Sequence, residues 1–185
     1  MSSLPPSSHA LLASLRAAFS GRLVSDPAGM APWLRDYRQR WGGPALAVVQ
    51  PDSTADVAAV VRWCVDHDAV VVPQGGNTGL TGASVPLGVP LSKPPSGAPP
   101  ASADKAPSKA RAEDPLLARG DTDAPPRPVI LLSLSRMQQV RSVDALASTM
   151  VVEAGCTLQA AQEAAAAHGR LFPLSLASEG SCTIG

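Results

Sequence analysis

Hydrophobic positions in residues 8–21 repeat at the spacing of an amphipathic helix. Ser7 or Ser8 can cap the start of this helix, and Gly21 is suited to its end. The irregular segment that follows contains Trp33 and Trp41, which we expect to anchor it on a core. The apolar face of the helix carries Leu11, Leu12, Leu15 and Phe19. The pattern predicts a helix that packs at the edge of a domain.

A strand, a helix and a second strand are predicted for residues 45–73. Residues 45–50 are a short apolar run, and Ser53 with Asp56 has the spacing of a helix capping box. Val70 to Val72 suit a fully buried strand that Pro73 ends. The intervening helix has the apolar positions Val57, Val60, Val61, Cys64 and Val65. We therefore expect a βαβ unit whose parallel strands point their carboxyl ends at the loop after Pro73.

The pattern breaks at residues 87–128, which are rich in proline, alanine and serine and in which large apolar side chains show almost no periodicity. Such a stretch buries too little surface to offset the entropy of ordering, so it predicts a disordered insert. Beyond it, residues 129–137 and 149–154 are strand candidates, and Thr157 can cap a helix running to about His168, before Gly169. The predicted divisions are residues 1–44, a lead-in; 45–86, a first subdomain; 87–128, the insert; and 129–185, the start of a second subdomain.

Composition narrows the function classes. The 185 residues have a formal net charge of zero and only 3% aromatic residues, which argues against a nucleic-acid partner. The sequence has neither a membrane-spanning apolar run nor a secretory leader pattern, so we expect a cytoplasmic protein, with a mitochondrial location or a peripheral one at the inner membrane as alternatives. The cysteines are widely spaced and form no zinc motif, so we expect reduced thiols at Cys64, Cys156 and Cys182 and no metal site.

The loop after Pro73 is dense in glycine and is the first candidate for binding chemistry. We expect its glycines to supply positive φ angles and close backbone approach, so that consecutive N–H groups surround a phosphate. Side chains of Asn77, Thr78 and Thr81 could complete the hydrogen bonding. Neither the Rossmann nor the Walker phosphate motif is present, and a simple glycine-rich turn is the alternative interpretation. The four glycines are Gly75, Gly76, Gly79 and Gly82.

The octapeptide P-Q-G-G-N-T-G-L, residues 73–80, resembles the first flavin-binding loop of the vanillyl-alcohol oxidase superfamily of FAD-linked oxidases and dehydrogenases, with the PCMH-type domain. The resemblance implies an α+β fold in which a small parallel βαβ subdomain is followed by the start of a mixed or antiparallel one. It also implies that Asn77, where covalent relatives often place histidine, leaves FAD bound non-covalently. The residues that would hold the FAD pyrophosphate are Gly75, Gly76, Asn77, Thr78, Gly79 and Leu80.

A second flavin-binding segment is implied by residues 172–185, F-P-L-S-L-A-S-E-G-S-C-T-I-G. By its small residues and hydroxyls alone, this run is equally typical of a Ser/Gly turn. By resemblance to the family, Leu174 would approach the isoalloxazine ring. The residues that would contact FAD here are Ser178, Ser181, Cys182, Thr183 and Gly185.

The resemblance is to the branch that oxidises D-2-hydroxy acids such as D-lactate, glycolate or D-2-hydroxyglutarate to 2-oxo acids. It implies a small-molecule hydroxy acid and an electron acceptor, still unidentified, as partners. That family carries its catalytic histidine and any metal ligands in later segments, so we assign no catalytic or metal-binding residue here. The alternatives are a truncated, inactive fragment, or another reaction on the same scaffold, such as that of an alditol oxidase or a reductase.

Overall fold

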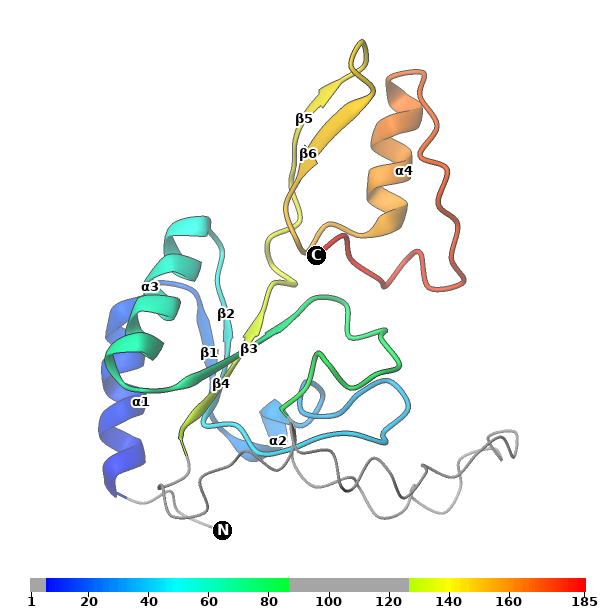
Figure 1. The fold of residues 1–185 in the computed structure, drawn as a ribbon. Helices are drawn as coiled ribbons and strands as arrows, with labels where there is room; N and C mark the ends of the chain where they lie inside the picture. The colour runs from blue at the N-terminus through cyan, green and yellow to red at the C-terminus, as the bar shows by residue number, and fades with distance from the viewer. Residues whose placement is uncertain (1–5, 87–126) are drawn as a thin grey trace, which may run out of the picture.

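The computed structural model describes residues 6–86 and 127–185, which form two lobes (Figure 1). The first lobe comprises residues 6–86 and 127–133, and the second lobe comprises residues 140–185. A linking segment, residues 134–139, joins them. The predicted insert lies outside the described residues except for Arg127 and Pro128, so its disorder stays a prediction. None of the described helices is long and apolar enough to cross a membrane.

The first lobe is built on a four-stranded sheet in the order β1-β2-β4-β3. Its strands are β1 (Arg22–Val24), β2 (Ala47–Gln50), β3 (Val70–Gln74) and β4 (Val129–Ser133). β2 and β3 are each parallel to β4, which lies between them, whereas β1 is antiparallel to β2. The expected βαβ unit is therefore present, but β4 separates its two strands.

Each face of this sheet packs against helical structure. Helices α1 (Pro6–Ala18) and α3 (Thr54–Asp66) lie against one face, and the short helix α2 (Pro27–Met30) lies against the other (Figure 1). Trp63 of α3 is buried, and its indole N–H donates to the hydroxyl of Ser14 in α1 at 2.9 Å. On the α2 side, Val48 and Leu131 pack with Met30. Alternating strand residues thus supply two apolar layers.

Helix α1 begins and ends at other residues than the sequence predicted. α1 begins at Pro6, so Ser7 and Ser8 lie inside it, and it ends at Ala18 instead of reaching Gly21. Gly21 is needed for close approach, because a Cβ there would overlap the carbonyl oxygen of Gln50. Trp33 packs against the core on the α2 side of the sheet, as expected.

Helix α3 confirms the predicted capping box and modifies the predicted apolar stripe. The Ser53 hydroxyl accepts from the Asp56 N–H at 3.1 Å and donates to the Asp56 carboxylate at 2.8 Å. Cys64 is buried as expected, but Val61 is 41% exposed and Val65 is 75% exposed. The buried stripe is displaced toward Trp63 because this side chain, the largest on the helix, is the one that meets α1.

Strand β3 differs from the fully buried strand that the valine run predicted. It lies at the edge of the sheet, Val70 is 36% exposed, and the strand continues through Pro73 to Gln74. Proline is tolerated there because only one side of an edge strand is paired. The run of three valines therefore reflects strand propensity more than burial.

The second lobe consists of a hairpin and one helix. The hairpin strands are β5 (Val140–Asp144), which the sequence analysis missed, and β6 (Thr149–Val152). Helix α4 (Leu158–Ala167) begins after Thr157, whose hydroxyl accepts from Ala160 N–H at 3.1 Å, and Gly169 follows with a φ of 66°. Both features were predicted. The strand predicted for residues 129–137 ends at Ser133, and the next residues form the linking segment.

Candidate functional site

A cavity of about 200 Å³ lies between the glycine loop of the first lobe, residues 75–84, and the last residues of the second lobe. In the ribbon the two segments approach each other from opposite lobes (Figure 1). The lining contains glycine, hydroxyl and amide residues and no charged side chain. These residues are Gly75, Gly76, Asn77, Thr78, Gly79, Thr81, Ala83, Ser84, Thr183 and Gly185.

The paired glycines bring the two segments into direct contact. A Cβ on Gly75 would overlap the Thr183 hydroxyl, and a Cβ on Gly76 would overlap the carbonyl oxygen of Ser181. The Gly76 N–H donates to Thr183 Oγ1 at 2.9 Å, and that hydroxyl donates to the Gly185 carbonyl at 2.8 Å. Glycine is thus required here because no larger side chain fits between the two backbones.

This finding corrects the expected role of the glycines. Among the four glycines of the loop, only Gly82 has a positive φ, 76°, and its Cα lies against the Trp41 ring. The other left-handed residue of the loop is Asn77, with a φ of 51°. Gly79 has open space where a Cβ would be. The close approach predicted for Gly76 exists, but the neighbour is the protein's own second segment.

Side chains of the loop hold its shape. Gln74 is buried, and its amide donates to the carbonyls of Trp33 and Ser84, each at 2.9 Å. The Asn77 amide donates to the Arg35 carbonyl at 2.7 Å, and its oxygen accepts from the Ser84 hydroxyl at 2.8 Å. Both ends of the Asn77 side chain are therefore engaged inside the protein, and the residue also lines the cavity.

Consecutive backbone N–H groups of this loop are available to a ligand. The N–H groups of Asn77, Thr78 and Gly79 donate to no acceptor within the described part of the chain. Successive N–H groups in a turn create a concave site with partial positive charge, which suits an anion. The lining therefore fits a phosphate or pyrophosphate group, with Thr78 and Thr81 contributing hydroxyls.

Main-chain hydrogen bonds hold the second segment. The N–H groups of Ile184 and Gly185 donate to the carbonyls of Cys156 and Ala154, each at 2.9 Å. Thr157 and Thr183 form an isolated antiparallel bridge. The segment thus runs beside the residues that precede α4, and this arrangement directs Thr183 and Gly185 toward the cavity.

The cavity includes only some of the residues that the sequence analysis proposed. Leu80 and Leu174 are half exposed outside its lining, and the Ser178 carbonyl accepts from the N–H groups of Ser181 and Cys182 in a turn beside it. The sequence analysis did not single out Ala83 and Ser84, although Ser84 follows the last loop glycine and could have been found as a hydroxyl partner for Asn77. The predicted residues that line the cavity are Gly75, Gly76, Asn77, Thr78, Gly79, Thr183 and Gly185.

Burial, hydrogen bonds and nearby charges explain the shifted pKa values of three titratable groups in the two lobes. Burial raises the pKa of Cys64 to about 11, and burial followed by the nearby Glu153 charge raises the pKa of Cys156. The Gln139 N–H and then the Arg141 guanidinium lower the pKa of Glu153. All three cysteines are buried and free. Within residues 6–86 and 127–185, no group of His, Cys, Asp and Glu side chains could hold a metal ion.

Comparison with known proteins agrees with the fold. The FAD binding domain family model matches residues 45–92 and 102–185. The chain is 31% identical over 164 residues to D-2-hydroxyglutarate dehydrogenase of Xanthomonas citri, covering 89% of this chain and 26% of that protein. It is 30% identical over 178 residues to the mitochondrial D-2-hydroxyglutarate dehydrogenase of Bos taurus, covering 94% of this chain and 25% of that protein. Both relatives extend well beyond the matched region.

The fold is also found in a solved structure. Alkyldihydroxyacetonephosphate synthase superposes with a TM-score of 0.68 at 16% identity, covering 99% of this chain and 28% of that one. The chain belongs to the FAD binding domain family, with the α+β fold of its PCMH type. It spans about a quarter of the length of the curated relatives that it matches.

Proposed function

We propose that this chain is the FAD-binding part of a flavin-dependent oxidoreductase that converts a D-2-hydroxy acid to the 2-oxo acid. The observation that carries the proposal is the cavity shared by the two lobes. Where the loops meet, it offers hydroxyls and N–H groups that have no acceptor among the described residues. The substrate class is supported by the two relatives above, which are named as dehydrogenases of D-2-hydroxyglutarate.

In this proposal the N–H groups of Asn77, Thr78 and Gly79 hold the pyrophosphate, and Thr78 and Thr81 add hydroxyl donors. Thr183 and Gly185 close the opposite side of the cavity. Leu174, which is 49% exposed, provides apolar surface for the flavin ring at the edge of the second lobe. When bound, the flavin would accept hydride from the substrate and pass the electrons to an acceptor.

We further propose that FAD is bound non-covalently. The Asn77 side chain is an amide, which is a poor nucleophile, and both its ends are hydrogen-bonded to Arg35 and Ser84. The buried Cys182 contributes to the turn beside the cavity, and the cavity lining does not include its side chain. Retention of FAD then depends on the N–H groups and on the fit between the two loops.

The visible absorption spectrum of the purified protein, before and after acid precipitation, tests the cofactor. Flavin bands that move into the supernatant are expected, whereas a yellow precipitate would contradict non-covalent binding. A colourless protein that takes up no FAD on titration would overturn the proposal. Turnover is tested on the product of the complete reading frame with D-2-hydroxyglutarate, D-lactate and glycolate, an artificial electron acceptor, and L-2-hydroxyglutarate as the control.

A further inference from the structure

The cavity is lined from both lobes, so its width depends on the angle between them. The glycine loop and the C-terminal residues meet on one side of the linking segment, through Gly76 and Thr183. The first turn of α3 lies on the other side of that segment (Figure 1). A contact at α3 can therefore set how closely the two loops approach. Like the contact between Gly76 and Thr183, it restrains rotation of the lobes about the linking segment.

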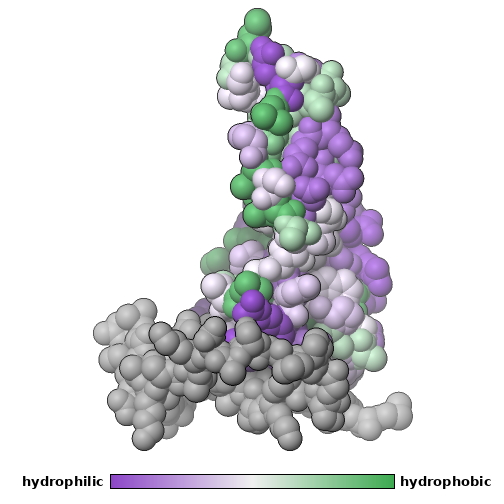
Figure 2. Space-filling model, turned by 90° about the vertical axis from the view of Figure 1, so that its right-hand side faces the viewer, coloured by the Kyte–Doolittle hydropathy of each residue, from purple (hydrophilic) through white to green (hydrophobic). Residues whose placement is uncertain are grey.

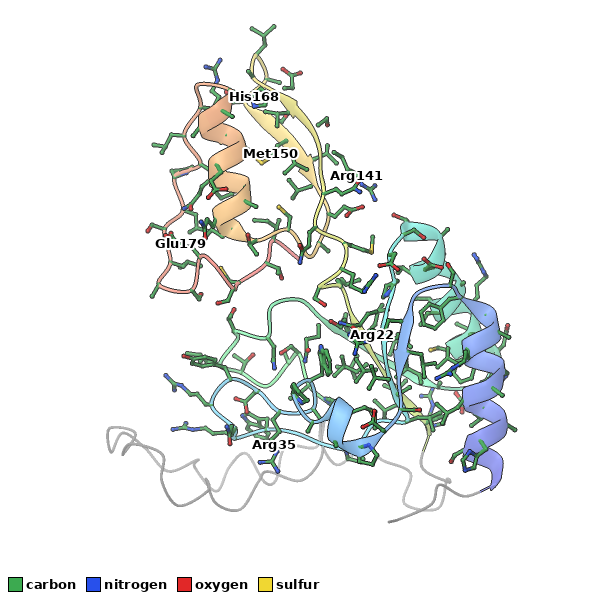
Figure 3. The ribbon with its side chains drawn as sticks, turned by 180° about the vertical axis from the view of Figure 1, so that it is seen from behind. Arg22, Arg35, Arg141, Met150, His168 and Glu179 are labelled. Carbon is green, nitrogen blue, oxygen red and sulfur yellow. The ribbon has the colours of Figure 1, made fainter. Side chains whose placement is uncertain are left out.

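Arg141 makes such a contact. Its Nη2 donates to the Thr54 hydroxyl in the first lobe at 3.1 Å and to Glu153 Oε1 in the second lobe at 3.1 Å. Figure 3 shows the Arg141 side chain projecting from the hairpin on the side where α3 lies. The guanidinium thus joins a strand of one lobe to the first residue of a helix in the other.

The carboxylate that holds Arg141 is itself fixed. The Glu153 side chain is only 8% exposed, and its Oε2 accepts from the Gln139 N–H at 2.9 Å. Gln139 belongs to the linking segment, so Glu153 ties the base of the hairpin to the point where the lobes join. Arg136 of the same segment pairs with Asp52, just before α3.

The position of Arg141 is not favoured by the helix that it meets. A cation near a helix N-terminus opposes the helix dipole, so α3 alone would not attract the guanidinium. The contact depends on Glu153, which orients the side chain, and on the Thr54 hydroxyl, which accepts from it. The hydrogen bond to Thr54 is exposed, so it contributes little to overall stability.

We propose that Arg141 is a positioning residue for cofactor binding, which holds the two lobes at the angle that the FAD cavity requires by joining Glu153 to Thr54. This inference rests on the proposed function. It assigns Arg141 a role at a distance from the cavity, with no contact to the cofactor.

FAD affinity of Arg141→Met, Arg141→Lys and Thr54→Val, measured by fluorescence titration, tests the inference. Arg141→Met keeps the aliphatic part of the side chain and loses its donors, and Thr54→Val removes only the acceptor in the other lobe. Arg170→Met is the matched control, because within the described part of the chain Arg170 donates to the carbonyls of Ala145 and Gly169, both in its own lobe. Visible circular dichroism of the bound flavin reports changes in its surroundings.

We expect Arg141→Met and Thr54→Val to weaken FAD binding by about fivefold to tenfold, as is typical of coupled sites. Both should change the dichroism of the flavin while the unfolding temperature stays near that of the wild type. Arg141→Lys should recover much of the affinity, and Arg170→Met should match the wild type.

Wild-type affinity in both Arg141→Met and Thr54→Val would overturn the inference and leave the proposed function intact. A loss in Arg141→Met without one in Thr54→Val, or an equal loss in Arg170→Met, would also overturn it, because the effect would then not pass through the contact between lobes. Failure of the wild-type protein to bind FAD would overturn the proposed function, and the inference with it.

Discussion

The first lobe buries an apolar layer on each face of its sheet, whereas the second lobe is largely exposed. Every residue of β2 and most residues of β4 are buried. In contrast, neither β5 nor β6 contains a buried residue. Figure 2 shows hydrophobic residues on the surface of the second lobe. A two-stranded hairpin with one short helix has little core of its own, so its stability depends on what it packs against.

The difference extends to the two segments that line the cavity. The glycine loop leaves a strand of the buried sheet and is held by the side chains of Gln74 and Asn77. The second segment is held by main-chain hydrogen bonds to residues 154–158 and by its contact with Gly76. The first lobe therefore supplies a preformed half of the site, and the second lobe completes it through contact. Four experiments test this view.

Gly76→Val should have the largest effect, because its side chain would overlap the Ser181 carbonyl and separate the two segments. We expect FAD affinity to fall by at least about 100-fold, or about 2.7 kcal/mol. The core of the first lobe should stay folded by far-UV circular dichroism. Gly180→Ala is the control, since Gly180 lies outside the cavity lining and a Cβ there would come near the flexible end of the Gln159 side chain alone. Equal retention of FAD by both variants would contradict the preformed contact.

Leu131→Ala should lower the free energy of unfolding by about 2–5 kcal/mol, because it leaves a cavity in the central strand of the first lobe. Val151→Ala in β6, where the side chain is 55% exposed, should cost less than about 0.5 kcal/mol. Urea denaturation followed by Trp fluorescence measures both. A similar cost at the two positions would mean that the lobes do not differ as described.

Thr183→Val should weaken FAD binding by about fivefold to tenfold, because the Gly76 N–H and the Gly185 carbonyl both lose their partner. Thr183→Ser keeps the hydroxyl and should bind FAD almost as the wild type does. Isothermal titration with FAD distinguishes the two. If serine fails to restore binding, the methyl group of Thr183 matters more than its hydrogen bonds.

Asp56→Asn tests how the stability of the first lobe falls at acid pH, and we expect its effect to be the smallest of the four. Hydrogen bonds from Ser53 and then Ser20 lower the pKa of Asp56. Its contribution to stability is therefore fully present above the unfolded value of about 3.9 and is lost as the pH falls through the folded pKa. We expect Asp56→Asn to lower the free energy of unfolding by about 1 kcal/mol at neutral pH. As the pH falls, this variant should lose less stability than the wild type does. Urea midpoints across the acid range measure this, and parallel acid curves would contradict it.

Local chemistry was predictable where it depends on neighbours in sequence. The Ser53 and Thr157 caps, the helix end at Gly169 and the burial of Cys64 all appear as the pattern indicated. The sequence analysis was wrong to place Val65 on the buried face of its helix and Val70 in a fully buried strand. Both depend on which partner an element meets, and periodicity alone does not identify that partner.

The glycine loop shows the same division within one motif. Its glycine content correctly indicated close backbone approach, but the approaching group at Gly75 and Gly76 is a segment more than a hundred positions away in the sequence. The β5 strand was missed because its residues alternate weakly and stay exposed. Short strands without a buried face carry little signal in a single sequence.

The caps of α3 and α4, the strand propensities and the small residues of the glycine loop follow from the amino-acid sequence, because they depend on the conformational preferences of each residue. Three further features depend on tertiary contacts: β4 lies between β2 and β3, Thr183 meets Gly76, and Arg141 reaches Thr54. These pairings join positions far apart in the chain, and their energies depend on shape and distance after folding.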